Sequence, residues 1–272
     1  MNEILRARFA AAHVPVRWAS SVQEFRLGRP SDEIDPDSRF FIDVRTKTRR
    51  GRLEEYLLIH VGRRADVRAL DIDPRRRQVL IYAREAAGSS GLERWDRRSL
   101  SSRTVVLRTE TRASRLLVGM DESHLFICPL LSVDRPSTIE GVHRVLAPDP
   151  VLEARAGGLH VRRQGEWFFV PVATPETLRE IEMAERSDQI QIRAPIVELG
   201  SWQHVREHRA DELIRSGDRI FVRGRVRHVD HRATILHQWH EVFRNTEARQ
   251  PANPWERQIF GRAGRYGTSW YD

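Results

Sequence analysis

The sequence contains a single cysteine, Cys128, and a single lysine, Lys47, among its 272 residues. One cysteine excludes an internal disulfide framework and fits a reducing compartment. No stretch approaches the roughly 18 consecutive apolar residues that span a bilayer, and MNEILRARFAAAHVPVRW lacks the apolar core of a secretory signal. We therefore predict a cytoplasmic protein without a membrane partner, in which Cys128 is a small buried hydrophobe of the run LFICPLL.

Several catalytic motifs are also missing from the sequence. It has no P-loop and no G-x-G-x-x-G after a strand, so enzymes that use nucleotide cofactors lose support. It also has no G-x-S-x-G elbow, no C-x-x-C pair and no kinase motif set. These absences leave the reaction class and the cofactor unspecified, and a divalent metal is the one cofactor that the residues below suggest.

Charge is abundant and biased toward arginine. The formal net charge is +8 and the pI is near 10.7, a balance that favours a polyanionic partner. Since one of the 46 basic residues is lysine, the other 45 are arginine, which indicates the codon usage of a GC-rich genome. The placement of the arginines is therefore more informative than their number.

Apolar strand-like runs dominate the first half of the chain. Short polar turns separate such runs at PRRR and MDES, and again at RQGE in the second half of the chain. This pattern is typical of antiparallel hairpins. We expect strands at 39–46, 55–62, 67–73 and 78–85, a loop at 86–102, and hairpins at 115–131 and 159–172. The sequence thus predicts an α+β fold, mostly antiparallel β-hairpins and meander with about three to four short helices.

Helical segments are expected at 1–12, 137–148, 174–187 and 201–217. A serine or threonine stands before the apolar positions of the second segment, Thr174 and Pro175 open the third, and Gly217 ends the fourth. A cluster of prolines suggests a β-rich domain at 1–136, an α+β domain at 137–245 and a tail at 246–272. A single compact domain is the alternative.

Six of the eleven histidines fall within 37 residues, which is the strongest irregularity of the composition. They are His204, His208, His228, His231, His237 and His240. Histidine is the commonest metal ligand and the usual general base near neutral pH. The string HVREH, from His204 to His208, resembles the H-x-x-E-H motif of the inverted zinc peptidases over five residues, and that resemblance implies a zinc-binding helix. The alternatives are a solvated helix face and a local pair between His208 and Glu212.

The stretch RVRHVDHRAT places His228, Asp230 and His231 in the turn of one hairpin. An inward histidine beside a carboxylate and a second histidine is a candidate metal ligand, or a base held in one tautomer. A metal-dependent hydrolase, such as a nuclease, would use His228, His231 and one of His204, His208, His237 or His240 as ligands. Its water would be oriented by Asp230, Glu212 or Glu241. The alternative is a strand-end histidine that hydrogen-bonds the turn aspartate.

Alternation along RIFVRGRVRH places Phe221, Arg223, Arg225 and Arg227 on one face of a strand. Arg162 and Arg163 beside Trp167 and Phe169 form a second such feature. Sheet faces that mix arginine with aromatic residues bind single-stranded nucleic acid, because bases stack on the rings while cations follow the backbone. The alternative is an edge strand whose charge blocks aggregation.

The segment WERQIFGRAGRYGTSWYD, residues 255–272, combines arginine, glycine and aromatic residues. It is interpreted as an arm that orders on nucleic acid, or as a segment that docks on the protein or on a protein partner. The first functional hypothesis is therefore a nucleic-acid-binding protein, for DNA or RNA. The alternatives are the metal-dependent hydrolase and a non-catalytic assembly subunit.

Overall fold

The computed structural model describes residues 2–21, 24, 37, 39–49, 52–86, 88–96, 101–109, 111–122, 124–130, 136–196, 208–229 and 231–246. These residues divide between two compact units, the first ending at Val142 and the second beginning at His143. The division falls within helix α2 (Ile139–Leu146), shortly after the boundary that the sequence suggests between 136 and 137. Among the described helices, none is long and apolar enough to cross a membrane.

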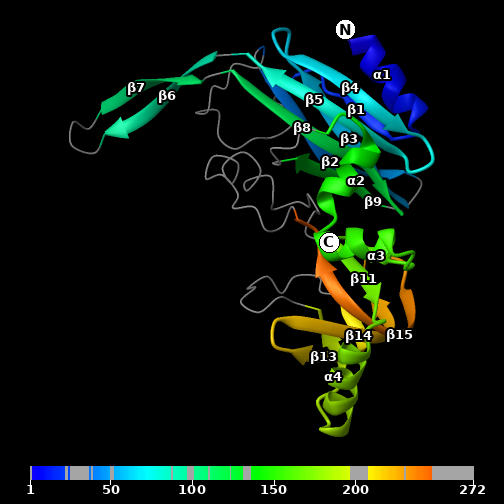
Figure 1. Cartoon of the computed structure of the whole chain (residues 1–272). Coiled ribbons are helices and arrows are strands. Elements are labelled where there is room, and N and C mark those ends of the chain that lie inside the picture. The colour runs from blue at the N-terminus through cyan, green and yellow to red at the C-terminus, as the bar shows by residue number, and fades with distance from the viewer. Residues whose placement is uncertain are drawn as a thin grey trace. The chain divides into compact units, whose positions relative to one another are not determined.

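The first unit is built mainly from antiparallel strands (Figure 1). One sheet has the order β1-β3-β2, another has the order β4-β5-β8-β9, and β6 pairs with β7. Only the β1–β3 pair is parallel among these. Its elements are α1 (Asn2–Ala11), β1 (Val16–Trp18), β2 (Phe40–Arg49), β3 (Arg52–Val61), β4 (Asp66–Asp73), β5 (Gln78–Glu85), β6 (Gly88–Asp96), β7 (Ser101–Thr109), β8 (Arg112–Asp121) and β9 (His124–Leu130).

One apolar core joins α1 to the strands of the β1-β3-β2 and β4-β5-β8-β9 sheets. Leu5 and Phe9 of α1 are buried in it, whereas Ile4 of the same helix is 72% exposed. Leu5 and Phe9 lie one turn apart, so they share a face of the helix, and Ile4 points elsewhere. Cys128 is fully buried, as the apolar run around it predicts.

The prediction of a loop at 86–102 is wrong over much of that range. Strand β6 occupies Gly88–Asp96 and pairs with β7 in a long antiparallel ribbon (Figure 1). Glycine and serine at 88–91 suggested a loop, because these residues are common in turns and rare in strands. Pairing with a β-branched partner strand, TVVLRT, overrides that preference.

The second unit is one six-stranded antiparallel sheet with two helices of its own. The sheet order is β10-β11-β15-β14-β13-β12, so β14 is a central strand and β10 and β12 are the edges. Its elements are α3 (Asp149–Ala156), β10 (Arg162–Gln164), β11 (Trp167–Pro171), α4 (Pro175–Arg186), β12 (Gln191–Pro195), β13 (Arg209–Ser216), β14 (Arg219–Arg227) and β15 (Thr234–Arg244). Both units together confirm the predicted α+β fold, dominated by antiparallel strands.

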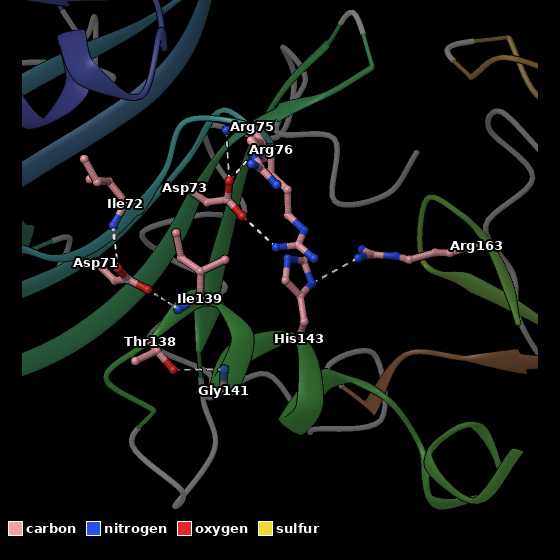
Figure 2. A network of polar contacts seen from close by, with 10 residues as sticks. All are labelled: Asp71, Ile72, Asp73, Arg75, Arg76, Thr138, Ile139, Gly141, His143 and Arg163. Carbon is pink, nitrogen blue, oxygen red and sulfur yellow. Dashed lines mark hydrogen bonds and ion pairs between the residues drawn. The ribbon is translucent and has the colours of Figure 1, made fainter. Parts of the chain in front are cut away.

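Two helices begin where the sequence predicts. Thr174 accepts a hydrogen bond from the backbone N–H of Thr177 and precedes Pro175, the first residue of α4. Thr138 accepts from the backbone N–H of Gly141 at the start of α2, and Asp71 of β4 accepts from the N–H of Ile139 (Figure 2). These side chains satisfy amide groups that have no partner within the first turn of a helix.

The helix predicted at 201–217 is wrong where the structure describes the segment. Residues 209–216 form strand β13, which pairs with both β12 and β14. Residues 201–207 lie outside the described residues. His208, the last residue of HVREH, is therefore not in a helix, and the other four residues of that string lie outside the described residues.

The sheet of the second unit buries apolar residues on two sides. One cluster contains Val222 and Val226 of β14 with residues from β11, β12, β13 and β15. Another contains Phe221 of β14, which packs with Ile181 and Ala184 of α4. Strand β14 therefore contributes side chains to both clusters, which fixes its position between β13 and β15.

Candidate metal centre

Three histidines converge at one end of the sheet. The ligand nitrogens of His208, His228 and His231 all lie within 4.8 Å of one another. The rings of His208 and His228 are stacked with centroids 4.2 Å apart, and the ring of His231 is 4.9 Å from His228 and 5.5 Å from His208. His208 and His228 are buried and His231 is partly buried. Three of the six clustered histidines thus meet in space.

The pairing of β13 with β14 brings the first two histidines together. Arg209 lies opposite Arg227 in this ladder, and continuing the register by one residue places His208 beside His228. Neighbouring strands lie about 4.8 Å apart, which is the separation at which two imidazole rings stack. His231 follows in the connection between β14 and β15.

A β-bulge sets this register. Glu212 lies opposite Arg223, whereas Ala210 lies opposite Val226, so β14 carries one extra residue between these pairs. Gly224 stands in the bulge with a φ of +86°, a conformation that glycine adopts without steric cost. Without the extra residue, the ladder would place Arg227 opposite His208.

A buried glutamine holds the connection that carries His231. Gln164 of β10 is 3% exposed, and its side-chain amide donates to the carbonyl oxygen of Arg232 at 2.7 Å. Arg232 immediately follows His231, so this hydrogen bond restrains the backbone next to the third imidazole. Gln164 was not singled out from the sequence, since only the tertiary fold brings β10 to this turn.

Burial keeps the His208 ring neutral. Desolvation, together with the charges that His228 and His231 carry when protonated, lowers the pKa of His208 to about 2. Neutral imidazole is the form that binds a metal. The Nε2 atoms of His208 and His231 are buried and, among the described residues, have no hydrogen-bond partner. A buried nitrogen without a hydrogen-bond partner costs about 1–3 kcal/mol of stability, and a bound ligand would remove that cost.

The two other candidate ligands that the structure describes, His237 and His240, do not lie in the cluster. His237 is exposed on β15, and His240 of the same strand is buried with its Nδ1 donating to the carbonyl oxygen of Gln238 at 2.7 Å. Neither belongs to the three-histidine cluster. His204 and Asp230 lie outside the described residues.

The two described carboxylates proposed as water-orienting groups are engaged with arginines. Glu212 accepts from Arg223, and Glu241 accepts two hydrogen bonds from Arg219, at 2.7 and 2.8 Å. The predicted pair between His208 and Glu212 is absent from the described contacts, because the segment is a strand and not a helix. In this structure the two glutamates stabilise the sheet surface.

The arginine row of β14 differs from the predicted binding face. Phe221 is fully buried under α4 and is therefore unavailable for stacking on a base. Arg223 pairs with Glu185 and Glu212, and Arg227 pairs with Asp211. Arg225 is exposed. The edge-strand alternative is also wrong, since β14 is central.

The second predicted arginine-aromatic feature is likewise only partly exposed. Arg162 and Arg163 of β10 are exposed, but Trp167 and Phe169 beside them are 5% and 0% exposed. The two rings belong to the core of the sheet, so they do not offer a stacking surface. Arg163 takes part in a different arrangement that is described below.

The arginine- and aromatic-rich segment at 255–272 lies outside the described residues, so its proposed roles stay predictions. Comparison of the chain with family models, with curated proteins and with solved structures finds no match. The chemistry of the site therefore has to be argued from its own geometry.

Proposed function

We propose that this chain is a metal-binding protein in which His208, His228 and His231 hold one divalent transition-metal ion. The observation that supports the proposal is the convergence of three imidazoles from two strand ends and one turn, within 4.8 Å. Two of the three offer buried nitrogens with no hydrogen-bond partner among the described residues. A purely structural histidine cluster has no need to leave those nitrogens unsatisfied.

The ligand type selects the class of metal. Imidazole nitrogen suits zinc, copper, iron and nickel, whereas calcium and magnesium prefer oxygen ligands. Among the described residues, the cluster contains histidines only. Zinc is the ion we expect, because a set of neutral nitrogen ligands matches its preference for tetrahedral coordination.

Coordination requires a small rearrangement of the rings. Zinc–nitrogen bonds are about 2.0–2.1 Å long, so two nitrogens on one tetrahedral ion lie about 3.4 Å apart. The nitrogens of the cluster lie within 4.8 Å of one another. The rings, which are stacked or tilted against one another, would have to rotate about their side-chain bonds to bind one ion.

The proposal is tested by calorimetric titration of tag-free, metal-free protein with Zn²⁺. We expect one ion per chain, and at least about a tenfold loss of affinity in His208→Ala, His228→Ala and His231→Ala, since even groups that only support a ligand contribute that much. His237→Ala is the matched control, because His237 is an exposed histidine of the same sheet outside the cluster. Affinity for Co²⁺, read from its visible absorption, should follow the same order.

Two results would overturn this assignment. One is a wild-type protein that takes up no metal beyond the level of a histidine-free control protein. The other is an affinity that stays the same in all three cluster variants as in His237→Ala. Either result would leave the three rings as a stacked, neutral part of the core.

Three protein ligands are also the number found in catalytic zinc sites, where water fills the fourth position and loses a proton near neutral pH. This observation favours, as an extension of the proposal, a metal-dependent hydrolase such as a nuclease. Asp230 is its remaining candidate base. Zinc-dependent hydrolysis of bis(p-nitrophenyl) phosphate that is lost in both His231→Ala and Asp230→Asn would support it. Absence of turnover in the zinc-loaded wild-type protein would restrict the centre to metal binding.

A further inference from the structure

Two arginines in the second unit approach the same aromatic ring. The guanidinium carbon of Arg155 lies 5.4 Å from the centroid of the Phe168 ring, and that of Arg163 lies 5.6 Å from it. Phe168 is 2% exposed and packs against Ala147 and Val151. A cation over an aromatic face is attracted by the ring quadrupole, so a fixed ring positions both arginines.

The strand register and the helix explain this convergence. Arg163 of β10 lies directly opposite Phe168 of β11 in the antiparallel ladder. Arg155 lies in the last turn of α3, the end of a helix at which the dipole favours a cation. Helix α3 packs on β11, which brings both cations close to the Phe168 ring.

No carboxylate among the described residues neutralises either of these two charges. Within the described part of the chain, neither Arg155 nor Arg163 has a carboxylate within ion-pair distance, whereas Arg219, Arg223 and Arg227 of the same unit all do. Burial lowers the pKa of Arg155, and the charge of Arg163 lowers it further. Two like charges that share a partly dehydrated surface repel each other, and a bound anion removes that repulsion.

The donors of Arg163 are partly fixed. Its Nε donates to the carbonyl oxygen of Gly165 at 2.8 Å, and one terminal nitrogen lies 3.4 Å from Nδ1 of His143 (Figure 2). Because a guanidinium can only donate, Nδ1 of His143 accepts and the proton of the neutral ring is on Nε2. The contacts with Gly165 and His143 restrain the Arg163 guanidinium beside the Phe168 ring.

We propose that Arg155 and Arg163 form a binding site for a phosphate group, in which His143 helps to position Arg163. The planar fork of arginine matches the oxygens of phosphate and binds them in pairs. A free phosphate and a phosphate of a single-stranded nucleic-acid backbone present the same chemistry to such a site. The site shares no residue with the three-histidine centre, so its existence does not depend on metal binding.

The experiment measures two ligands with the full-length protein. Binding of inorganic phosphate is followed by calorimetry, and binding of a fluorescent single-stranded oligonucleotide is followed by anisotropy at low and at moderate salt. Arg155→Gln and Arg163→Gln should each weaken binding about tenfold, the effect of losing one charge-assisted hydrogen bond. Arg163→Lys should recover only part of the affinity, because it keeps the charge and loses the fork.

Arg227→Gln is the matched control, since it removes another exposed arginine of the same unit that is already paired with Asp211. Phosphate binding that is lost in both site variants and kept in the control supports a site for a small phosphate. If only the oligonucleotide binds, and its binding is lost in both site variants and kept in the control, the site is supported with backbone phosphate as its ligand. No binding of either probe by the wild-type protein, or equal losses in the site variants and the control, overturns the proposal.

Discussion

Gly224 of β14 and Asp211 of β13 approach so closely that a Cβ on Gly224 would lie 2.7 Å from the Cβ of Asp211. The same aspartate accepts a hydrogen bond from the backbone N–H of Arg225 at 2.9 Å. Both contacts belong to the bulge that shifts the β13–β14 register by one residue. That shift places His228, and not Arg227, beside His208. The three-histidine cluster therefore depends on a glycine that is four residues from His228 in the sequence.

Gly224→Ala should destabilise the protein and weaken its metal binding together. The substitution adds strain at a φ of +86° and a clash with Asp211, which together cost about 1–3 kcal/mol in the free energy of unfolding. Gly217→Ala is the control, since it has a positive φ of +56° with open space around the added Cβ. Urea unfolding and zinc titration of both variants test the argument. Zinc affinity equal to that of the wild-type protein in a folded Gly224→Ala variant would show that the bulge does not set the site.

Phe221→Ala should lower the free energy of unfolding by about 3–5 kcal/mol, the usual cost of truncating a buried phenylalanine. Phe221 is fully buried between α4 and the sheet, beside Trp239. Ile235→Ala, at a residue 48% exposed on the neighbouring strand, should change the stability by about 0.5 kcal/mol or less. Urea unfolding compares the two. A stable Phe221→Ala protein would mean that the ring is available at the surface, as a base-stacking role requires.

The helix expected at 201–217 shows why part of the site was hidden in the sequence. Ala210, Leu213 and Ile214 are buried in β13 at a spacing of three and four residues, which is the spacing of a helix face. In the strand, Ala210 and Leu213 belong to one apolar cluster and Ile214 to another, and the register shift lies between Ala210 and Glu212. Gly217 then resembles a helix stop, although it stands in the two-residue turn of a hairpin.

What the sequence could predict was local. Hairpins with short turns, such as Asp66–Asp73 with Gln78–Glu85, follow from patterns within about ten residues. His228 and His231 could be paired for the same reason, since one turn carries both. Placing His208, the third histidine of the cluster, required the register of a bulged ladder, and the burial of Phe221 required the position of α4. Neither the register of the ladder nor the position of α4 can be predicted from a short stretch of sequence.

His240→Gln should reduce the dependence of stability on pH in the metal-free protein. Burial lowers the pKa of His240 from its usual value of 6.5, the hydrogen bond to Gln238 opposes this, and the charge of Arg162 adds to it. As the pH falls below 6.5, the unfolded chain takes up a proton that the folded protein does not, so stability decreases. Between about pH 7.5 and about pH 5, the wild-type protein should lose more stability than the variant. If the stability of the wild-type protein and that of His240→Gln changed with pH in the same way, His240 would have the same pKa in the folded and the unfolded chain.

Asp71→Ala should destabilise the start of α2 by about 1 kcal/mol, the typical cost of losing a capping side chain. One carboxylate oxygen of Asp71 accepts from the N–H of Ile139 at 2.8 Å, and the other accepts from the N–H of Ile72 at 2.9 Å (Figure 2). Ile139 is 2% exposed, so water cannot replace the lost acceptor at its amide. Asp66→Ala on the same strand removes only an exposed pair with Arg68 and serves as the control. Hydrogen exchange resolved at the amide of Ile139 gives the direct measurement, and protection unchanged in Asp71→Ala would contradict the role of this carboxylate as a cap.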